Sequence, residues 1–511
     1  MLAKAWSAAV LGVDGLLVQV EVDLALGLPG FSTVGLAEGA VREAKDRVRA
    51  AIKNSGYEFP ARKITVNLAP ADVKKGGTGY DLPIALGILA ASGLIAGDSL
   101  AGIGIVGELS LDGLVRPVPG VLSMVQAAAT SGEIDRFLVP AENAAEAAVV
   151  GNIDVIGVQR LDQAVEYLTG HQQLSATRVD IKEFFRNRGG YPVDFSEVKG
   201  QEHIKRALEV AAAGGHNILL SGVPGTGKTM MARRLPSILP DLSLDEALET
   251  TRIYSAGGLL PQGTPLLVTR PFRSPHHTIS DAGLIGGGRI PKPGEVSLAH
   301  NGVLFLDELP EFKKNVLEVM RQPLEDGRVT IARAAASLRF PARFMMVGAM
   351  NPCPCGFHGD PHKECICTQM QIQRYRNRLS GPLLDRIDIQ AEVPPVRVQD
   401  IERAEPGETS AAIRKRVNAA RKIQSLRFAG APDIHCNAQM STKLLKKHCS
   451  LDKASSRLLH QAIDNLGLSA RAYTRILKIS RTIADLAGSG QITATHIGEA
   501  IQYRRIQYGA E

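Results

Sequence analysis

The nine residues SGVPGTGKT, 221–229, decide the fold class of this 511-residue chain. The preceding residues 217–220, NILL, are typical of a short buried strand, and we expect a helix to begin at Lys228. Glycines between them let the backbone turn its N–H groups toward an anion, and the helix N-terminus adds partial positive charge. The pattern predicts a phosphate-binding loop. Its nucleotide-binding residues are Gly222, Val223, Pro224, Gly225, Thr226, Gly227, Lys228 and Thr229.

A second motif follows in GVLFLDE, residues 302–308, where a buried strand over 303–306 ends in two acids. We expect Asp307 and the Thr229 hydroxyl to ligate Mg²⁺, and Glu308 to polarise the attacking water. The Lys228 ammonium would reach the β and γ phosphates. Together the two motifs predict hydrolysis of a nucleoside triphosphate, with ATP and Mg²⁺ as the bound groups.

Composition places the chain among globular proteins, with 44% hydrophobic and 22% charged residues. Residues 1–170 hold 13 Lys and Arg against 19 Asp and Glu, whereas 171–511 hold 46 against 33. The later part is therefore net +13, which suits either a polyanion or a solvated basic face. The most apolar stretch of the whole chain, 82–96, is too short for a membrane span, so no membrane partner and a cytoplasmic location are expected.

Four regions are predicted along the chain. Residues 1–172 alternate strand and helix patterns and form an α+β domain, and the polar stretch 173–192 is a linker. Residues 193–395 form an α/β core around the phosphate loop. Residues 396–511 contain amphipathic helical runs, such as 411–428 and 454–466, and form a helical domain.

Three further residues are candidates for the nucleotide site. Asn351 follows a strand over 344–349, so its amide could hold the attacking water; asparagine is equally common there as a turn former. Arg386 lies in GPLLDRID, and Arg471 lies near the start of a C-terminal helix. A lone arginine is more often a surface ion-pair partner than a catalytic group.

Four cysteines gather in NPCPCGFHGDPHKECICTQ, residues 351–369. Cys353, Cys355, Cys365 and Cys367 form two CxC pairs, and four thiolates satisfy a tetrahedral Zn²⁺ site. The CxC spacing is tighter than the usual CxxC, so free surface thiols are the alternative. The cluster begins just after Asn351, which predicts that a structural zinc braces this loop.

Five ordered motifs give the chain a family resemblance: SGVPGTGKT, LFLDELPEF, AMNPCPCG, GPLLDRIDI and LSARAYTRILKISRTIADL. The set resembles the ComM/YifB family of magnesium-chelatase-like AAA+ ATPases over nearly the whole chain. The resemblance implies an AAA+ P-loop core with a C-terminal helical lid, and a homo-hexameric ring. It also implies that Asn351 is the sensor 1 residue, Arg386 an arginine finger acting on the neighbouring subunit, and Arg471 the sensor 2 arginine.

Two insertions belong to the same resemblance. Residues 270–302 resemble the helix 2 insert, and residues 326–344 resemble a hairpin that precedes the sensor 1 strand. Arg333, at the tip of that hairpin, would face the pore of a ring and is the candidate DNA-binding residue. The alternative is an ordinary solvated turn residue.

The first region resembles the proteolytic domain of Lon-type proteases over 73–93 and 107–132. An active member needs a serine nucleophile and a lysine base. The matching positions hold Asp81 and Leu122, which predicts a domain without peptidase activity, although Thr78 could be a displaced nucleophile.

Three classes of function remain. The basic later part, Arg333 and a basic helical stretch (Arg414, Lys415, Arg416, Arg421 and Lys422) favour a DNA motor. The resemblance points to branch migration of single-stranded or branched DNA during integration of transforming DNA. A metal-chelatase motor subunit and a protein-remodelling ATPase are the alternatives, and no porphyrin is expected as a substrate.

Overall fold

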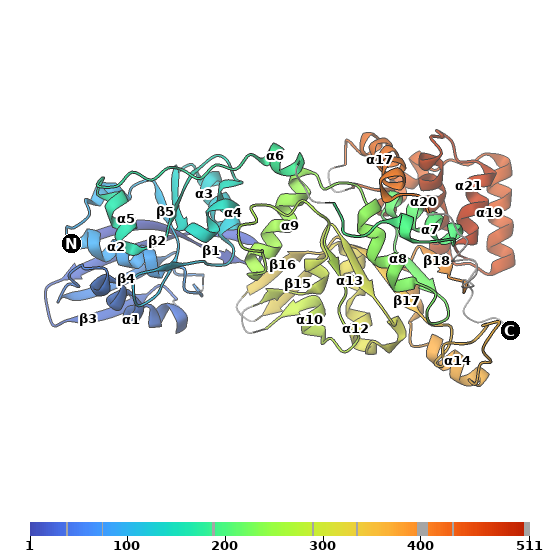
Figure 1. The fold of residues 1–511 in the computed structure, drawn as a ribbon, viewed down its shortest axis with the longest axis horizontal. Coiled ribbons are helices and arrows are strands. Elements are labelled where there is room, and N and C mark those ends of the chain that lie inside the picture. The colour runs from blue at the N-terminus through green and yellow to red at the C-terminus, as the bar shows by residue number, and fades with distance from the viewer. Residues whose placement is uncertain are drawn as a thin grey trace.

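The computed structural model describes residues 1–36, 39–73, 75–186, 190–288, 291–333, 336–395, 407–431 and 434–504. Three parts follow one another along the long axis of the molecule (Figure 1). An N-terminal α+β part lies at one end, an α/β core lies in the middle, and helices of the C-terminal part lie at the other end.

The N-terminal part is a seven-stranded sheet in the order β3-β4-β2-β1-β5-β8-β9. Alternation explains β2: Val18, Val20 and Val22 are completely buried, and the residues between them are partly exposed. The elements are β1 (Leu2–Leu11), β2 (Asp14–Ala25), β3 (Gly30–Val34), α1 (Gly39–Asn54), β4 (Lys63–Ala69), α2 (Asp81–Ala91), β5 (Ile103–Ile105), β6 (Glu108–Leu109), β7 (Val115–Arg116), α3 (Val121–Ser131), β8 (Arg136–Pro140), α4 (Ala144–Ala148), β9 (Asp154–Val158) and α5 (Leu161–Leu168).

The core is a parallel sheet in the order β11-β14-β17-β10-β18, flanked by helices. Strands β10, β14 and β17 are buried on both faces, which their unbroken apolar sequences require. The elements are α7 (Glu202–Gly214), β10 (Ile218–Ser221), α8 (Lys228–Arg234), α9 (Leu244–Gly257), β11 (Phe272–Arg273), α10 (Asp281–Ile285), β12 (Gly286–Gly287), β13 (Lys292–Pro293), α11 (Glu295–Leu298), β14 (Val303–Leu306), α12 (Lys314–Val319), α13 (Arg321–Asp326), β15 (Arg328–Arg333), β16 (Ala336–Pro341), β17 (Met345–Met350), α14 (Gln369–Arg376), α15 (Gly381–Leu384) and β18 (Ile389–Glu392).

The C-terminal part is helical, as the sequence predicts. Its elements are α17 (Ser410–Arg427), α18 (Thr442–His448), α19 (Lys453–Leu466), α20 (Ala470–Leu486) and α21 (Ala494–Gln502). One buried apolar cluster joins Leu208 of α7, Ile413 of α17 and Ile476 of α20. The C-terminal helices therefore share a hydrophobic core with the side of the sheet that α7 covers.

The N-terminal part contacts the core through several of its described segments. The predicted linker contains helix α6 (Ile181–Arg186), whose Ile181 and Phe184 pack against a small buried cluster that includes Leu122 and Leu242. The turn between β1 and β2 lies against the β15–β16 hairpin, where a Cβ on Gly12 would lie 3.4 Å from the carbonyl oxygen of Arg339. This turn and the hairpin are neighbours in Figure 1.

Arg252 of α9 fixes the same turn. Its guanidinium bonds the carbonyl oxygen of Val13 at 2.9 Å and the carboxylate of Asp14 at 2.7 Å. Its Nε donates to the hydroxyl of Ser123 on α3 at 3.3 Å. A single side chain of the core thus joins two elements of the N-terminal part. Within the described ranges, no helix combines the length and apolar character needed to cross a membrane.

Candidate nucleotide-binding site

The predicted nucleotide-binding residues meet at the C-terminal ends of the strands in the core sheet. Because β10, β14 and β17 are parallel neighbours, the residues that follow them lie together. The Thr229 hydroxyl donates to Oδ2 of Asp307 at 2.7 Å. The Lys228 amine donates to Oδ1 of Asn351 at 3.2 Å. The structure therefore joins the loop, the first acid and the asparagine into one site.

The phosphate loop has the backbone that its glycines predict. Gly227 has a φ of 87°, a left-handed conformation that favours glycine, immediately before α8 begins at Lys228. A side chain at Gly222 would place its Cβ 2.4 Å from the carbonyl oxygen of Val393. The Lys228 amine also donates to the carbonyl oxygens of Gly222 and Val223, at 2.6 and 2.9 Å. The loop thus holds its own lysine inside the turn.

These residues fit a nucleotide with Mg²⁺. Burial lowers the pKa of the Lys228 amine, and the nearby Asp307 carboxylate acts in the opposite direction. A hydroxyl and a carboxylate oxygen, from Thr229 and Asp307, are the hard ligands that Mg²⁺ prefers. The N-terminal N–H groups of α8 and the Lys228 cation suit phosphate. The donor set therefore fits both groups.

Glu308 occupies a strained backbone position beside this site. Its φ is 50°, which a residue with a Cβ rarely adopts and which costs on the order of 1–3 kcal/mol. Its carboxylate lies 3.5 Å from Nδ1 of His277, in the loop after β11. His277 also packs edge-on against Phe312. His277 is not among the residues predicted from the sequence; its only sequence signal is the pair of adjacent histidines in the predicted helix 2 insert.

Arg386 lies at the opposite, N-terminal ends of the strands in the same sheet. It precedes β18, whereas the phosphate loop follows β10, and these two strands are parallel and in register over four residues. A strand of four residues spans about 13 Å, so the two groups lie at opposite ends of the strands. The Arg386 guanidinium donates to the carbonyl oxygen of Pro382 at 2.6 Å and pairs with Glu325. Arg386 is buried, and no local sequence pattern indicates its pairing with Glu325.

Arg471 lies with Arg386 rather than with Lys228. At the start of α20, its guanidinium is 3.4 Å from the carboxylate of Asp385, the neighbour of Arg386, and its side chain is mostly exposed. The structure thus places both candidate arginines near the N-terminal ends of the strands. It brings neither of them to the phosphate loop of its own chain.

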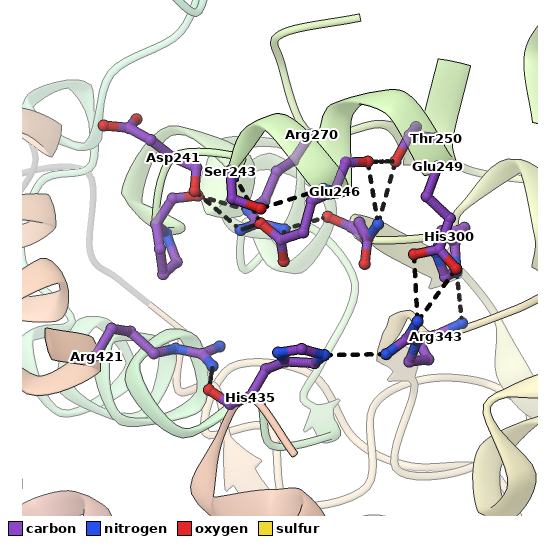
Figure 2. Close-up of polar contacts among 12 residues, drawn as sticks. Asp241, Ser243, Glu246, Glu249, Thr250, Arg270, His300, Arg343, Arg421 and His435 are labelled. Atoms are coloured by element: carbon purple, nitrogen blue, oxygen red, sulfur yellow. Dashed lines mark hydrogen bonds and ion pairs between the residues drawn. The ribbon is translucent and has the colours of Figure 1, made fainter. Parts of the chain in front are cut away.

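A cavity of about 1210 Å³ opens at the N-terminal ends of the strands, beside Arg386. Its wall includes Asn217, Met345 and Lys478. Charged side chains from α9 line another wall, and Figure 2 shows how they meet. Glu249 lies 2.9 Å from Nε2 of the buried His300 and 3.1 Å from Arg343. Arg343 in turn contacts Nε2 of His435 at 3.0 Å. The network links α9, the start of the sensor strand β17 and the C-terminal part.

Burial and these partners set the charge of Glu249. Burial alone would raise its pKa, but His300 and Arg343 lower it to about 2. The backbone N–H of Arg343 donates to Nδ1 of His300 at 2.9 Å, so the proton of the neutral ring belongs on Nε2, which faces Glu249.

The four cysteines form a compact cluster, as the sequence predicts. Cys353 Sγ is 3.3 Å from Cys355 Sγ and 3.7 Å from Cys365 Sγ, and all four sulfurs lie within 4.8 Å of one another. Four thiolates bound to one zinc at about 2.3 Å are roughly 3.8 Å apart. Backbone N–H groups of Cys355 and His358 point at Cys367 Sγ and Cys353 Sγ. The cluster fits a single tetrahedral ion, since an iron–sulfur cluster spreads its thiolates farther.

The structure gives little support to the candidate DNA-binding residues. The backbone of Arg333 ends β15, but its side chain and residues 334–335 lie outside the described residues. On α17, Arg416 pairs with Glu209 and Glu408, and Arg421 donates to the carbonyl oxygens of Ala212 and His435. Several charges of the predicted basic stretch are therefore occupied within the chain.

The N-terminal residues at the positions that match a protease site contact other residues of the N-terminal part or its apolar clusters. Asp81 is buried and receives two hydrogen bonds from Arg47, at 2.7 and 3.0 Å. Leu122 is buried in an apolar cluster, and the Thr78 hydroxyl donates to Glu108. Lys75 is a further buried residue, and burial lowers the pKa of its amine.

A parallel sheet with a phosphate loop after β10, an acid pair after β14 and an asparagine after β17 defines a P-loop nucleotide-binding core of the AAA+ type. Family models extend this class along the chain. Residues 194–401 match magnesium chelatase, subunit ChlI; residues 20–143 match subunit ChlI of Mg-chelatase; and residues 407–504 match the C-terminal region of that subunit.

Individual relatives narrow the family. The chain is 46% identical over 508 residues to competence protein ComM of Haemophilus influenzae, covering 98% of this chain and 97% of that one. It is 45% identical over 505 residues to protein YifB of Escherichia coli, covering 98% and 96%. The magnesium-chelatase 38 kDa subunit of Rhodobacter capsulatus is 27% identical over 231 residues, 42% of this chain and 62% of that one. The chain therefore belongs to the ComM/YifB family of magnesium-chelatase-like AAA+ ATPases, which confirms the predicted family.

Proposed function

We propose that this protein is an ATP-hydrolysing motor that works as a hexameric ring on DNA and promotes branch migration. The contact of Thr229 with Asp307 and of Lys228 with Asn351 carries the hydrolytic half of the proposal. The near full-length similarity to a competence protein supports DNA as the substrate. The net positive charge of residues 171–511 suits such a polyanion.

Each residue has a role in the proposed reaction. Lys228 and the N–H groups of the loop bind the phosphates of ATP, and Thr229 and Asp307 hold Mg²⁺, which neutralises phosphate charge when bound. Glu308 accepts a proton from the attacking water, and Asn351 orients that water. Arg386 and Arg471 stabilise the charge that develops on the phosphate.

The position of Arg386 supports the proposed ring. An arginine at the opposite ends of the strands from the phosphate loop cannot reach the nucleotide bound by its own chain. It can reach the nucleotide of an adjacent copy related by rotation. Mixed rings test this. If Lys228→Ala and Arg386→Ala subunits mix at random, about a quarter of interfaces combine an intact lysine with an intact arginine, and partial activity returns. Full assembly without any recovery would count against an arginine supplied in trans.

We extend the proposal to domain organisation. Residues 1–172 form a Lon-protease-like domain without peptidase activity, 173–192 connect it to the ATPase core 193–395, and 396–511 form the lid. The burial of Asp81 against Arg47 and of Leu122 in an apolar cluster supports inactivity. Peptide hydrolysis that is lost in both Thr78→Ala and Lys75→Ala would overturn it.

A structural zinc at the cysteine cluster is part of the proposal, supported by the sulfur spacing. It performs no redox chemistry, and Asn351 lies immediately before it in the chain.

One assay decides among the functions. ATP hydrolysis is measured with single-stranded, duplex and four-way-junction DNA, alongside Glu308→Gln as the hydrolysis-deficient control. We expect DNA to stimulate hydrolysis and junctions to be resolved only by the active protein. The match to magnesium-chelatase models supports a second candidate, a chelatase-type motor subunit, and hydrolysis indifferent to every DNA would favour it.

A further inference from the structure

The cysteine cluster lies against the phosphate loop as well as next to Asn351. We define the cysteine knuckle as residues 353–367, which carry the four sulfurs. A Cβ placed on Gly356 would lie 2.7 Å from Cγ of Pro224, 2.9 Å from its Cδ and 4.0 Å from Cγ of Asn351. Pro224 belongs to the phosphate loop itself. The knuckle backbone therefore packs directly on the loop, with no space for a side chain between them.

Gly356 belongs to the turn that carries the first two thiols. Its N–H donates to the carbonyl oxygen of Cys353 at 3.0 Å, and its φ is 89°. Cys353 is completely buried, whereas the other three cysteines are partly exposed. The position of Gly356 against Pro224 is thus tied to the position of the buried sulfur at the centre of the cluster.

The knuckle has little regular structure to hold it in place. No helix or strand lies within residues 353–367, and the loop between the two CxC pairs has nine residues. Short segments without a hydrophobic core depend on metals or other cross-links for a fixed fold. A single ion bound by all four sulfurs would close this loop and fix the turn that carries Gly356.

We propose that a soft divalent cation, Zn²⁺, in the cysteine knuckle sets the position of the phosphate loop through the Gly356–Pro224 contact, so that nucleotide affinity depends on metal occupancy. The inference rests on the proposed nucleotide site and goes beyond a structural brace, because it makes the knuckle an effector site for ATP. Loss of the ion frees the turn, withdraws support from Pro224 and loosens the loop N–H groups that bind phosphate.

The first test uses the full chain with a fluorescent ADP analogue as the probe. Its dissociation constant is measured in zinc-loaded protein, in protein stripped with a thiol-reactive mercurial and a chelator and then reduced, and after zinc is returned. We expect roughly tenfold weaker binding on stripping. Zinc should restore the affinity, whereas added Mg²⁺ alone should not. Equal affinity with and without zinc, or a purified protein that never holds zinc yet binds normally, overturns the proposal.

Two matched glycine variants separate the contact from general damage. Gly356 and Gly359 both have left-handed backbones, with φ of 89° and 80°, but a Cβ at Gly359 meets nothing within 4 Å. Gly356→Ala should retain one zinc per chain and lose affinity for the ADP analogue, whereas Gly359→Ala should retain both. Equal affinities in the two zinc-loaded variants overturn the proposal even if stripped protein unfolds.

The outcome also separates this inference from the proposed function. Zinc-loaded wild-type protein that binds no nucleotide would refute the nucleotide site itself. Zinc-loaded protein that binds nucleotide with a zinc-independent dissociation constant would refute the coupling alone.

Discussion

The Lys228 amine and the Asn351 side-chain oxygen are 3.2 Å apart, although 123 residues separate them in the chain. Asn351→Ala removes this contact and the amide that orients water. We expect kcat for ATP hydrolysis to fall about 100-fold while nucleotide affinity changes much less. Steady-state kinetics and a separate binding assay distinguish the two. Asn377→Ala, at an exposed position just after α14, is the control and should behave as wild type.

His277 is a positioning residue for Glu308, because its Nδ1 lies 3.5 Å from the carboxylate. His277→Ala should lower kcat roughly tenfold and leave KM nearly constant, because the base Glu308 moves while the phosphate contacts remain. His277→Gln should recover part of the rate. The ring of the adjacent His276 lies 4.1 Å from the ring of His277, so the comparison is made with the wild-type protein. Equal rates in His277→Ala and wild-type protein would remove His277 from the mechanism.

Glu249 should make stability depend on acid pH. His300 and Arg343 lower its folded-state pKa to about 2, against an ordinary value of 4.5. A lowered pKa stabilises the fold above pH 4.5 and loses this effect as the pH falls toward 2, a contribution on the order of 2–3 kcal/mol.

The variant Glu249→Gln therefore tests this sign. It should lower the thermal midpoint at pH 7, and the difference from wild type should narrow as the pH falls below 4.5. A difference that stays constant between pH 7 and pH 3 contradicts the assigned ion pairs.

Arg252 should hold the N-terminal part to the core. Arg252→Ala removes the bonds to Val13 and Asp14 at a cost of about 1–2 kcal/mol, while the Ser123 hydroxyl still donates to the Val13 carbonyl. We expect faster proteolysis between the two parts and a lower thermal midpoint. Arg62→Ala removes an exposed arginine of the N-terminal part and should have neither effect. Unchanged cleavage in Arg252→Ala would mean that α6 and its apolar cluster suffice to join the two parts.

Local patterns predicted the phosphate loop well, because strand, glycines and helix follow one another within a few residues. The positions of α8 at Lys228 and of β14 at 303–306 agree with prediction. No local pattern singled out strand β1, because its pairing with β2 depends on a partner strand. The contacts of His277 with Glu308 and of Gly356 with Pro224 were also missed, since each joins segments that only the folded sheet brings together.

The separation of Arg386 from Lys228 by the length of the sheet strands has a genetic consequence. In the proposed ring each chain contributes to two catalytic centres, one through its lysine and one through its arginine. A subunit defective in both residues would silence two centres while it still assembles. Such an allele, expressed beside the normal gene, would be dominant, and its severity would rise more steeply than its share of the protein pool.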